Sequence, residues 1–181
     1  AASDVYKRQS IDGPEQIHNK QRQAEVYKKT IANIQKLQKS DCKVRLNSFI
    51  YNSNKQYVDE LMDLSKDMGL FSHLFIIFTP QGRGKEHYEE IIPAQEVEQI
   101  KNKILNRKQK ENRNIRLYDY SEYMHSCVLL TPLCDVISQG FYDEDSIKVG
   151  NMLEQPLEEL FSNPIFDHST HVLHYLQRRA K

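Results

Sequence analysis

A short apolar run, His73-Leu-Phe-Ile-Ile-Phe78, places the strongest constraint on how this chain can fold. Polar and apolar residues do not alternate in it, which is typical of a parallel strand covered on both faces. Before it, the sequence predicts an amphipathic helix over residues 56–68 and a strand over residues 43–51. Strand, helix and strand in this order predict a βαβ unit with a right-handed crossover. The predicted fold class is therefore α/β.

Further elements extend this unit in both directions. The spacing of apolar residues predicts a helix over residues 24–39, another helix from Pro93, and a strand over residues 115–118. Together with the βαβ unit, these elements alternate strand and helix, as a parallel sheet requires. We therefore expect residues 10–119 to form an α/β core.

The remaining residues, 120–181, differ from this core in their predicted secondary structure. They predict short strands around turns and a short helix over residues 156–161, which indicates a small α+β extension. Near its end lie three histidines, His168, His171 and His174. They lack a carboxylate or cysteine partner in register, so we expect them on a helix surface rather than at a metal.

The first nine residues, AASDVYKRQ, show no apolar periodicity. They resemble translated adaptor read-through from sequencing libraries, so residues 1–9 are expected to be a non-native tail. A short natural tail is the alternative. In either case we expect no strand before Ser10, and an exposed apolar strand surface on that side of the sheet.

Composition narrows the classes of function. The 181 residues carry a formal net charge of zero, which argues against a dedicated nucleic-acid binder. The basic residues 101–110 are expected to be a solvated helix end rather than an RNA contact. No apolar run is long enough to span a bilayer, so no membrane partner is expected. Three cysteines, Cys42, Cys127 and Cys134, do not make a disulfide framework, and we expect a cytoplasmic protein.

Polar residues follow the ends of the expected strands. Ser10-Ile-Asp-Gly-Pro14 precedes the first helix, and Asn52 and the turn Thr79-Pro-Gln-Gly-Arg83 follow later strands. Ligands bind at the carboxyl ends of parallel strands, so these residues mark a candidate site. Arg83 suits a carboxylate ligand, unless its loop is merely a solvent loop.

The strand over residues 43–51 has a polar pair, Arg45 and Asn47, on one face and Leu46, Ser48 and Ile50 on the other. A polar face of this kind suits the interior of a barrel that carries a site. An edge strand with one solvent-exposed face would show the same alternation of polar and apolar residues.

These segments, in this order, resemble the second half of the partial β/α barrel of the radical S-adenosylmethionine (SAM) enzymes. The last of them resembles the C-terminal extension called SPASM, or its shorter form, twitch. The matching segments are Ser10-Ile-Asp-Gly-Pro14 with His18 and Arg22, Leu46-Asn-Ser-Phe-Ile50 closing at Asn54, Thr79-Pro-Gln-Gly-Arg83, and Ile147-Lys-Val-Gly-Asn-Met-Leu-Glu154 followed by Pro156-Leu-Glu-Glu-Leu-Phe161.

The resemblance implies a partial (β/α) barrel and a role for SAM. In an intact relative, a 4Fe–4S cluster reduces SAM to a 5′-deoxyadenosyl radical, which takes a hydrogen atom from the substrate. Relatives with such extensions often modify peptides or proteins, so by analogy a peptide or protein substrate is favoured over a small molecule.

The resemblance also implies which residues would bind SAM. Ser10 and Asp12 would hold its ribose or nearby polar atoms, and Asn47 would lie inside the barrel within its reach. Arg83 and Arg22 would face the methionyl carboxylate or support that rim. His18 is equally well explained as a packing residue of its helix. No catalytic residue and no metal ligand is assigned.

The chain departs from the family pattern at its cysteines. The defining Cys-x-x-x-Cys-x-x-Cys loop is absent, and Cys42, Cys127 and Cys134 do not have that spacing. We therefore expect a fragment of a radical SAM enzyme that forms no cluster and is inactive alone. We interpret Cys127 and Cys134 as small buried hydrophobic residues that remain after the loss of an auxiliary cluster. Alternatively, they are part of a site that is completed beyond the C-terminus.

One alternative belongs to another class of function. The chain would then be a cluster-less α/β module that binds a peptide or a nucleotide through the same rim.

Overall fold

The computed structural model describes residues 6–123 and 128–166 and divides the chain into two compact units. The first unit comprises Ala1–Phe78 and Gln95–Tyr118, and the second comprises Thr79–Ala94 and Asp119–Lys181. Cys127, His168, His171 and His174 lie outside the described residues, so the predictions made for them remain predictions.

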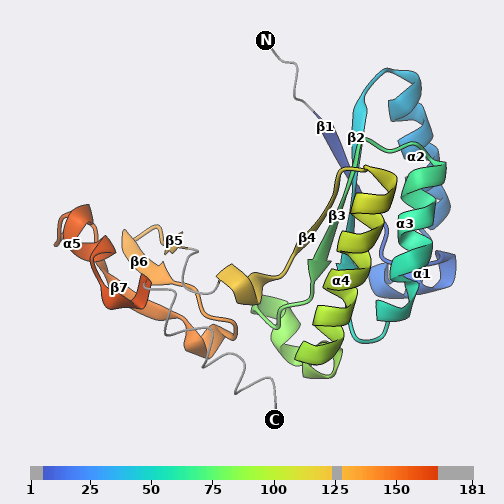
Figure 1. Ribbon diagram of the computed structural model, residues 1–181. Helices are drawn as coiled ribbons and strands as arrows, with labels where there is room; N and C mark the ends of the chain where they lie inside the picture. The colour runs from blue at the N-terminus through green and yellow to red at the C-terminus, as the bar shows by residue number, and fades with distance from the viewer. Residues whose placement is uncertain (1–5, 124–127, 167–181) are drawn as a thin grey trace. The chain divides into compact units, whose positions relative to one another are not determined.

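The first unit is built on a parallel sheet of four strands in the order β1-β2-β3-β4 (Figure 1). The strands are β1 (Tyr6–Ser10), β2 (Lys43–Ile50), β3 (Ser72–Ile77) and β4 (Ile115–Tyr118). The helices are α1 (Glu15–Arg22), α2 (Tyr27–Lys39), α3 (Val58–Asp67) and α4 (Ala94–Glu111). Strand order follows chain order, and helices connect successive strands, which confirms the predicted α/β class.

The two faces of this sheet differ. α2, α3 and α4 lie on one side of it (Figure 1). On β2, Leu46, Ser48 and Ile50 are buried, whereas the alternate residues Asn47 and Phe49 are only half-buried. Successive side chains of a strand point to opposite faces, so the buried set belongs to the helix-covered face. The sequence predicted this division, and we call the other side the open face.

Between the sheet and its helices lies the core of the first unit. It includes Ile11, Ile34, Leu46, Ile50, Leu61, Met62, Phe75, Ile77, Ile104 and Ile115, all at most 3% exposed. These side chains come from every strand except β1 and from α2, α3 and α4, so their burial fixes how the helices lie on the sheet.

Residues 6–10 form β1, so the expectation that no strand precedes Ser10 was wrong. β1 pairs in parallel with β2 from Tyr6 opposite Lys43 to Ser10 opposite Asn47. Backbone hydrogen bonding to a strand edge requires no apolar side chains, so apolar periodicity missed it. The Arg45 guanidinium also lies over the Tyr6 ring, 4.1 Å from its centroid. The origin of residues 1–9 stays a prediction.

The exposed side chains of β1 are Lys7 and Arg8, which are polar. The expected apolar surface on this side of the sheet is therefore not present in the described residues, because a charged strand forms the edge.

α2 begins at Tyr27, not at residue 24 as the apolar spacing predicted. The Asn19 Oδ1 atom accepts the backbone N–H groups of Val26 and Tyr27, at 3.0 and 2.9 Å. It thereby satisfies donors at the helix start that have no partner within the helix. A side chain seven residues upstream, rather than the local sequence, sets this boundary.

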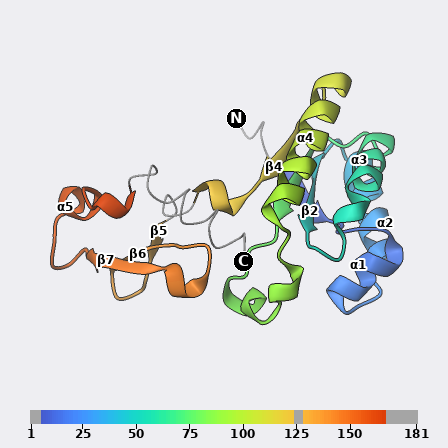
Figure 2. The same ribbon diagram turned by 60° about the horizontal axis from the view of Figure 1, so that its bottom comes forward.

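The second unit contains an antiparallel sheet in the order β5-β6-β7, with α5 beside β7 (Figure 2). The elements are β5 (Val128–Leu130), β6 (Asp135–Ser138), β7 (Ile147–Asn151) and α5 (Leu157–Phe161). These strands and this helix were predicted. The loop after β3 joins this unit, since Gly82 N–H donates to Asp143 Oδ2 at 3.2 Å and the Gln81 side chain bonds the Gly140 carbonyl.

Candidate functional site

The Asp12 side chain joins several segments at the carboxyl end of the first sheet. It follows β1 and is 1% exposed. Its Oδ1 accepts the Phe49 N–H at 2.9 Å, and its Oδ2 lies 2.7 Å from Arg22 Nη2. Asp12 thus ties the loop after β1 to the end of β2 and to α1. The Arg22 guanidinium and a backbone donor therefore hold this buried side chain in place.

His18 packs against this loop from α1. Its Nδ1 accepts the Asp12 backbone N–H at 3.2 Å and lies 3.7 Å from Asp12 Oδ2. A neutral ring that accepts at Nδ1 carries its hydrogen on Nε2. That Nε2 is buried, without a hydrogen-bond partner in the described part of the chain. The Tyr27 ring meets the imidazole edge-on at 5.9 Å. Of the two explanations the sequence left open, this geometry favours the packing role.

Asn54 completes the corner, and the sequence identified it only as the end of a motif. Its Nδ2 donates to the carbonyls of Asp12 and Phe49, at 2.7 and 2.8 Å, and its Oδ1 accepts the Tyr51 N–H at 2.6 Å. The side chain is fully buried. One amide therefore serves three backbone groups from two chain segments.

Ser10 and Asn47 face each other across β1 and β2 as register partners. Parallel partners share a face, so both side chains belong to the open face. The Asn47 Oδ1 atom is buried, and no donor reaches it among the described residues. A buried carbonyl oxygen without a donor is unfavourable, so this atom marks a place where a ligand donor would be accommodated.

Aromatic rings follow at the carboxyl ends of β2 and β3. The ring centroids of Phe49 and Tyr51 are 6.4 Å apart, and those of Tyr51 and Phe78 are 5.2 Å apart. Phe49 lies one step beyond Asn47 on the open face, because strand residues two apart share a face. A row of rings beside polar groups suits a flat ligand with an apolar body and polar edges.

Arg83 belongs to the second unit, whereas the other predicted SAM-binding residues belong to the first. It lies in a 3₁₀ turn, Gly82–Glu86, and is exposed. The structure thus brings together Ser10, Asp12, Asn47 and Arg22 around one strand end.

A buried polar chain runs beneath this corner, and the sequence did not predict it. Its four side chains are Ser48, His73, Ser65 and Arg113. His73 Nε2 lies 2.9 Å from Ser48 Oγ, His73 Nδ1 lies 3.0 Å from Ser65 Oγ, and Arg113 Nη2 donates to Ser65 Oγ at 2.9 Å. Burial, and then the Arg113 charge, lower the pKa of His73 to about 3, so its ring is neutral near pH 7.

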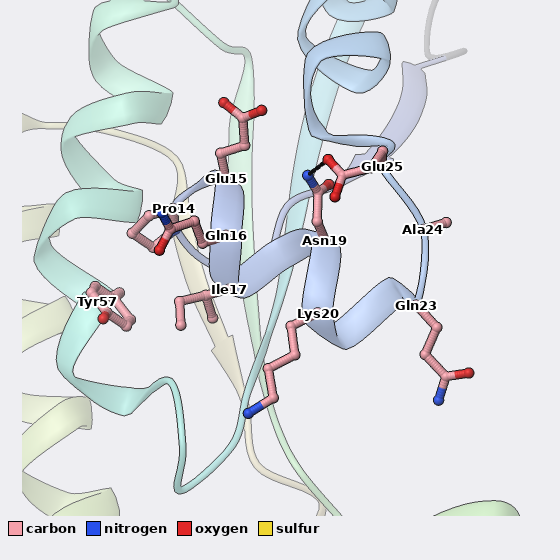
Figure 3. A pocket seen from close by; sticks show the side chains of 10 residues that line it. All are labelled: Pro14, Glu15, Gln16, Ile17, Asn19, Lys20, Gln23, Ala24, Glu25 and Tyr57. Atoms are coloured by element: carbon pink, nitrogen blue, oxygen red, sulfur yellow. Dashed lines mark hydrogen bonds between the residues drawn. The ribbon is translucent and has the colours of Figure 1, made fainter.

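A surface pocket of about 900 Å³ lies along α1 and the turn into α2 (Figure 3). Ile17 of α1 points towards Tyr57 across it, and Asn19 Nδ2 donates to Glu25 at 2.6 Å. None of the predicted SAM-binding residues lines this pocket. It is therefore separate from the corner around Asp12.

Within residues 6–123 and 128–166, no group of three or more His, Cys, Asp or Glu side chains could hold a metal ion. Cys42 and Cys134 are half-buried free thiols in different units. The described residues therefore do not fit a 4Fe–4S cluster, which needs several thiolates together.

In the described part of the chain, no helix combines the length and the apolar character needed to cross a membrane.

Comparison with known proteins places this geometry in context. No family model matches the chain. It is 25% identical over 164 residues to the AdoMet-dependent heme synthase of Methanosarcina barkeri (strain Fusaro / DSM 804), an alignment that covers 76% of this chain and 47% of that protein. Among solved structures, it is similar to "Native anSMEcpe with bound AdoMet", with a TM-score of 0.53, 15% identity, and coverage of 88% of this chain and 51% of that chain.

The chain shares the fold of anSMEcpe. A second structure, "Native anSMEcpe with bound AdoMet and Kp18Cys peptide", gives a TM-score of 0.50 at 15% identity and covers 96% of this chain and 53% of that chain. The chain thus spans about half the length of the proteins it matches. Both comparisons lead to proteins described with AdoMet, which is SAM, the ligand that the sequence resemblance implies.

Proposed function

We propose that this chain is part of a radical SAM enzyme and that the open face of its first sheet, at the carboxyl ends of the strands, binds SAM. The observation that carries the proposal is the buried Asn47 Oδ1, which lacks a donor and lies opposite Ser10. The shared fold with AdoMet-bound structures supports it. Ligands of parallel α/β sheets bind at this end of the strands.

Two side chains in this proposal touch the ligand directly. The Asn47 amide oxygen accepts a hydrogen bond from a hydroxyl or amino group of SAM, and the Ser10 hydroxyl donates to or accepts from its ribose. The rings of Phe49, Tyr51 and Phe78 line the apolar side of the same region. The adenine ring of SAM is flat and has polar edges, so it matches this arrangement.

Asp12 takes a supporting role in the proposal. Its two oxygens are bonded to the Phe49 N–H and to Arg22, and it is almost fully buried. It therefore orients the strand end rather than holding the ribose itself. The Arg22 side chain is 38% exposed and has further N–H groups, so it can still reach a carboxylate. Arg83 is proposed as a second carboxylate partner from the sequence resemblance alone.

The chemistry of the whole enzyme extends the proposal beyond this chain. In radical SAM enzymes, a 4Fe–4S cluster supplies the electron that cleaves SAM. Since the described residues do not fit such a cluster, our proposal for this chain is limited to holding SAM and excluding water. The same proposal includes a partial (β/α) barrel, a SPASM-like second unit and a peptide substrate. It also includes a cytoplasmic parent enzyme and an isolated chain that is inactive.

Titration calorimetry with S-adenosylhomocysteine, an unreactive analogue of SAM, tests the proposal on the full chain. We expect binding by the wild type and about tenfold weaker binding by Asn47→Ala, which removes the acceptor. Gln99→Ala is the matched control, because it removes an exposed amide from α4 and should bind like the wild type. Absence of binding by the wild type would contradict the proposal and favour the cluster-less binding module.

A further inference from the structure

The hydrogen bonds of the buried polar chain can be assigned a direction. Ser48 Oγ lies 2.5 Å from the Ile11 carbonyl oxygen. A carbonyl only accepts, so the single hydroxyl hydrogen of Ser48 goes to Ile11. The contact between Ser48 and His73 therefore needs a donor from the ring, and this donor is the Nε2–H of a neutral His73. Ser48 thus accepts a hydrogen bond from the His73 ring and donates one to the Ile11 carbonyl, just after β1.

The other side of the ring follows the same logic. His73 Nδ1 accepts from the Ser65 hydroxyl, and Ser65 accepts from Arg113 Nη2. The Ser65 hydroxyl is also placed to donate to the Met62 carbonyl, at 3.0 Å, and the same carbonyl accepts from Arg113 Nη1 at 3.2 Å. When the Ser65 hydrogen is on His73 Nδ1, the donors run from Arg113 towards β1. Aligned buried hydrogen bonds polarise and strengthen one another.

The chain ends at the segment that presents the candidate site. Ile11 N–H donates to the Asn47 carbonyl at 3.1 Å, and the next residue, Asp12, accepts the Phe49 N–H. The Ile11 carbonyl lies between these two bonds and is held by Ser48. Ser10 immediately precedes this segment, so its position opposite Asn47 depends on these bonds.

We propose that His73 is a positioning residue of the candidate SAM site. Acting through Ser48, it holds the segment of Ile11 and Asp12 against β2 and so keeps Ser10 opposite Asn47. The role in ligand binding rests on the proposed function, whereas the role in holding the strand end does not. His73 and Ser48 are at most 1% exposed, so both act from beneath the sheet without touching a ligand on the open face.

Amide hydrogen exchange on the full chain tests the geometric part. Ser48→Ala removes the hydroxyl that holds Ile11, and His73→Leu removes both ring nitrogens. His73→Gln keeps an N–H near the Nε2 position and is the conservative rescue. We expect faster exchange in the first two variants at the amides of residues 11–13 and at Phe49, and near-normal exchange there in His73→Gln.

Ser65→Ala is the matched control, since it removes a buried hydroxyl of the same chain but leaves the bond between Ser48 and Ile11. It should change overall stability without selective exchange at the strand end. Equal acceleration throughout the first unit in all variants, in proportion to the loss of stability, would show a merely structural role and overturn the proposal. Ser48→Ala keeps the test decisive even if His73→Leu does not fold.

Affinity for S-adenosylhomocysteine separates this proposal from the proposed function. Ser48→Ala should bind about tenfold more weakly than the wild type, whereas His73→Gln should bind within a few-fold of it. Selective exchange at the strand end together with no binding by the wild type would reject the SAM site but leave the positioning of β1 standing. Binding by Ser48→Ala equal to that of the wild type would reject the positioning role in ligand binding.

Discussion

Arg22 Nη2 lies 2.7 Å from Asp12 Oδ2 and joins α1 to the loop that follows β1. The two partners differ in burial, since the Arg22 side chain is 38% exposed and that of Asp12 is 2% exposed. Water can reach Arg22 but not the carboxylate. Removing one partner is therefore not equivalent to removing the other.

Asp12→Ala is expected to lower the free energy of unfolding by about 3 kcal/mol, because it leaves the Phe49 N–H without its acceptor. Arg22→Ala should lower it less, by about 1–2 kcal/mol, since the partly exposed guanidinium leaves a space through which water can then reach the carboxylate. Urea unfolding of both variants measures the difference. Asp59→Ala, which breaks an exposed pair with Lys103, serves as the control and should cost at most about 1 kcal/mol. Equal losses for Asp12→Ala and Asp59→Ala would contradict the buried role of Asp12.

Gly13 is in close contact with the first turn of α1. A Cβ atom added at Gly13 would lie 2.9 Å from Ile17 Cγ2 and 3.1 Å from Ile17 Cβ. Gly13→Ala should therefore destabilise the protein by about 1–2 kcal/mol, as an overpacked contact does. The double variant with Ile17→Ala should lose less stability than the sum of the single variants, because the 2.9 Å contact with Cγ2 is gone and only the 3.1 Å contact with Cβ remains. Strict additivity in urea unfolding would show that the Ile17 contact is not the cause.

The pKa of His73 makes stability depend on pH. Burial and the facing Arg113 charge hold this pKa at about 3 in the folded protein, against 6.5 for an ordinary histidine. Below pH 6.5 the unfolded chain takes up a proton that the folded chain refuses, so stability falls as pH falls from 6.5 towards 3. Well below pH 6.5, this loss of stability approaches about 1.4 kcal/mol per pH unit.

Urea unfolding between pH 7 and pH 4.5 measures this dependence. His73→Gln cannot titrate, so its stability should fall less steeply, by about 1 kcal/mol for each pH unit below 6. Carboxylates that also titrate in this window are common to both proteins and cancel in the difference. Parallel pH profiles of wild type and variant would contradict a neutral, buried His73.

Periodicity explains how far the sequence could predict this fold. The alternation on β2 gave the correct strand and the correct faces, because burial repeats with strand geometry. The continuous apolar run of β3 gave the correct strand, but its predicted coverage on both faces was wrong, since Leu74 and Ile76 on the open face are only half-buried. β1 carries no such signal, since its edge position leaves polar side chains such as Lys7 and Arg8 exposed.

The candidate site was predictable in its location but not in its bonding. The polar residues that the sequence placed after the strands lie at the carboxyl end of the sheet, and ligand binding there stays a prediction. The bond between Asp12 and the Phe49 N–H joins a side chain to a backbone group 37 residues away, and no local pattern encodes such a pair. A signal for the buried polar chain did exist, because Ser48 lies on the apolar face of its strand and His73 begins an apolar run. A polar residue at a buried position needs partners, but its partners depend on tertiary packing.

Exposed large apolar side chains gather in the second unit rather than beside β1. Val128, Leu129 and Leu130 of the edge strand β5 are 38–52% exposed, and Leu133 in the following turn is 76% exposed. An exposed apolar edge of this kind binds hydrophobic dyes and promotes association. We expect the chain to bind anilinonaphthalene sulfonate and to associate at high concentration.

The variant Leu129→Lys, Leu133→Lys should lower both dye fluorescence and the apparent mass in light scattering, because it places two charges on this edge. Leu105→Lys is the control, since Leu105 is 49% exposed but lies on α4 in the first unit. It adds one lysine charge instead of two, at an exposure comparable to that of Leu129, and should change neither signal. If Leu105→Lys reduced association as much as the β5 variant, general charge repulsion rather than the β5 edge would be the cause. The dye and scattering signals would then arise elsewhere in the chain.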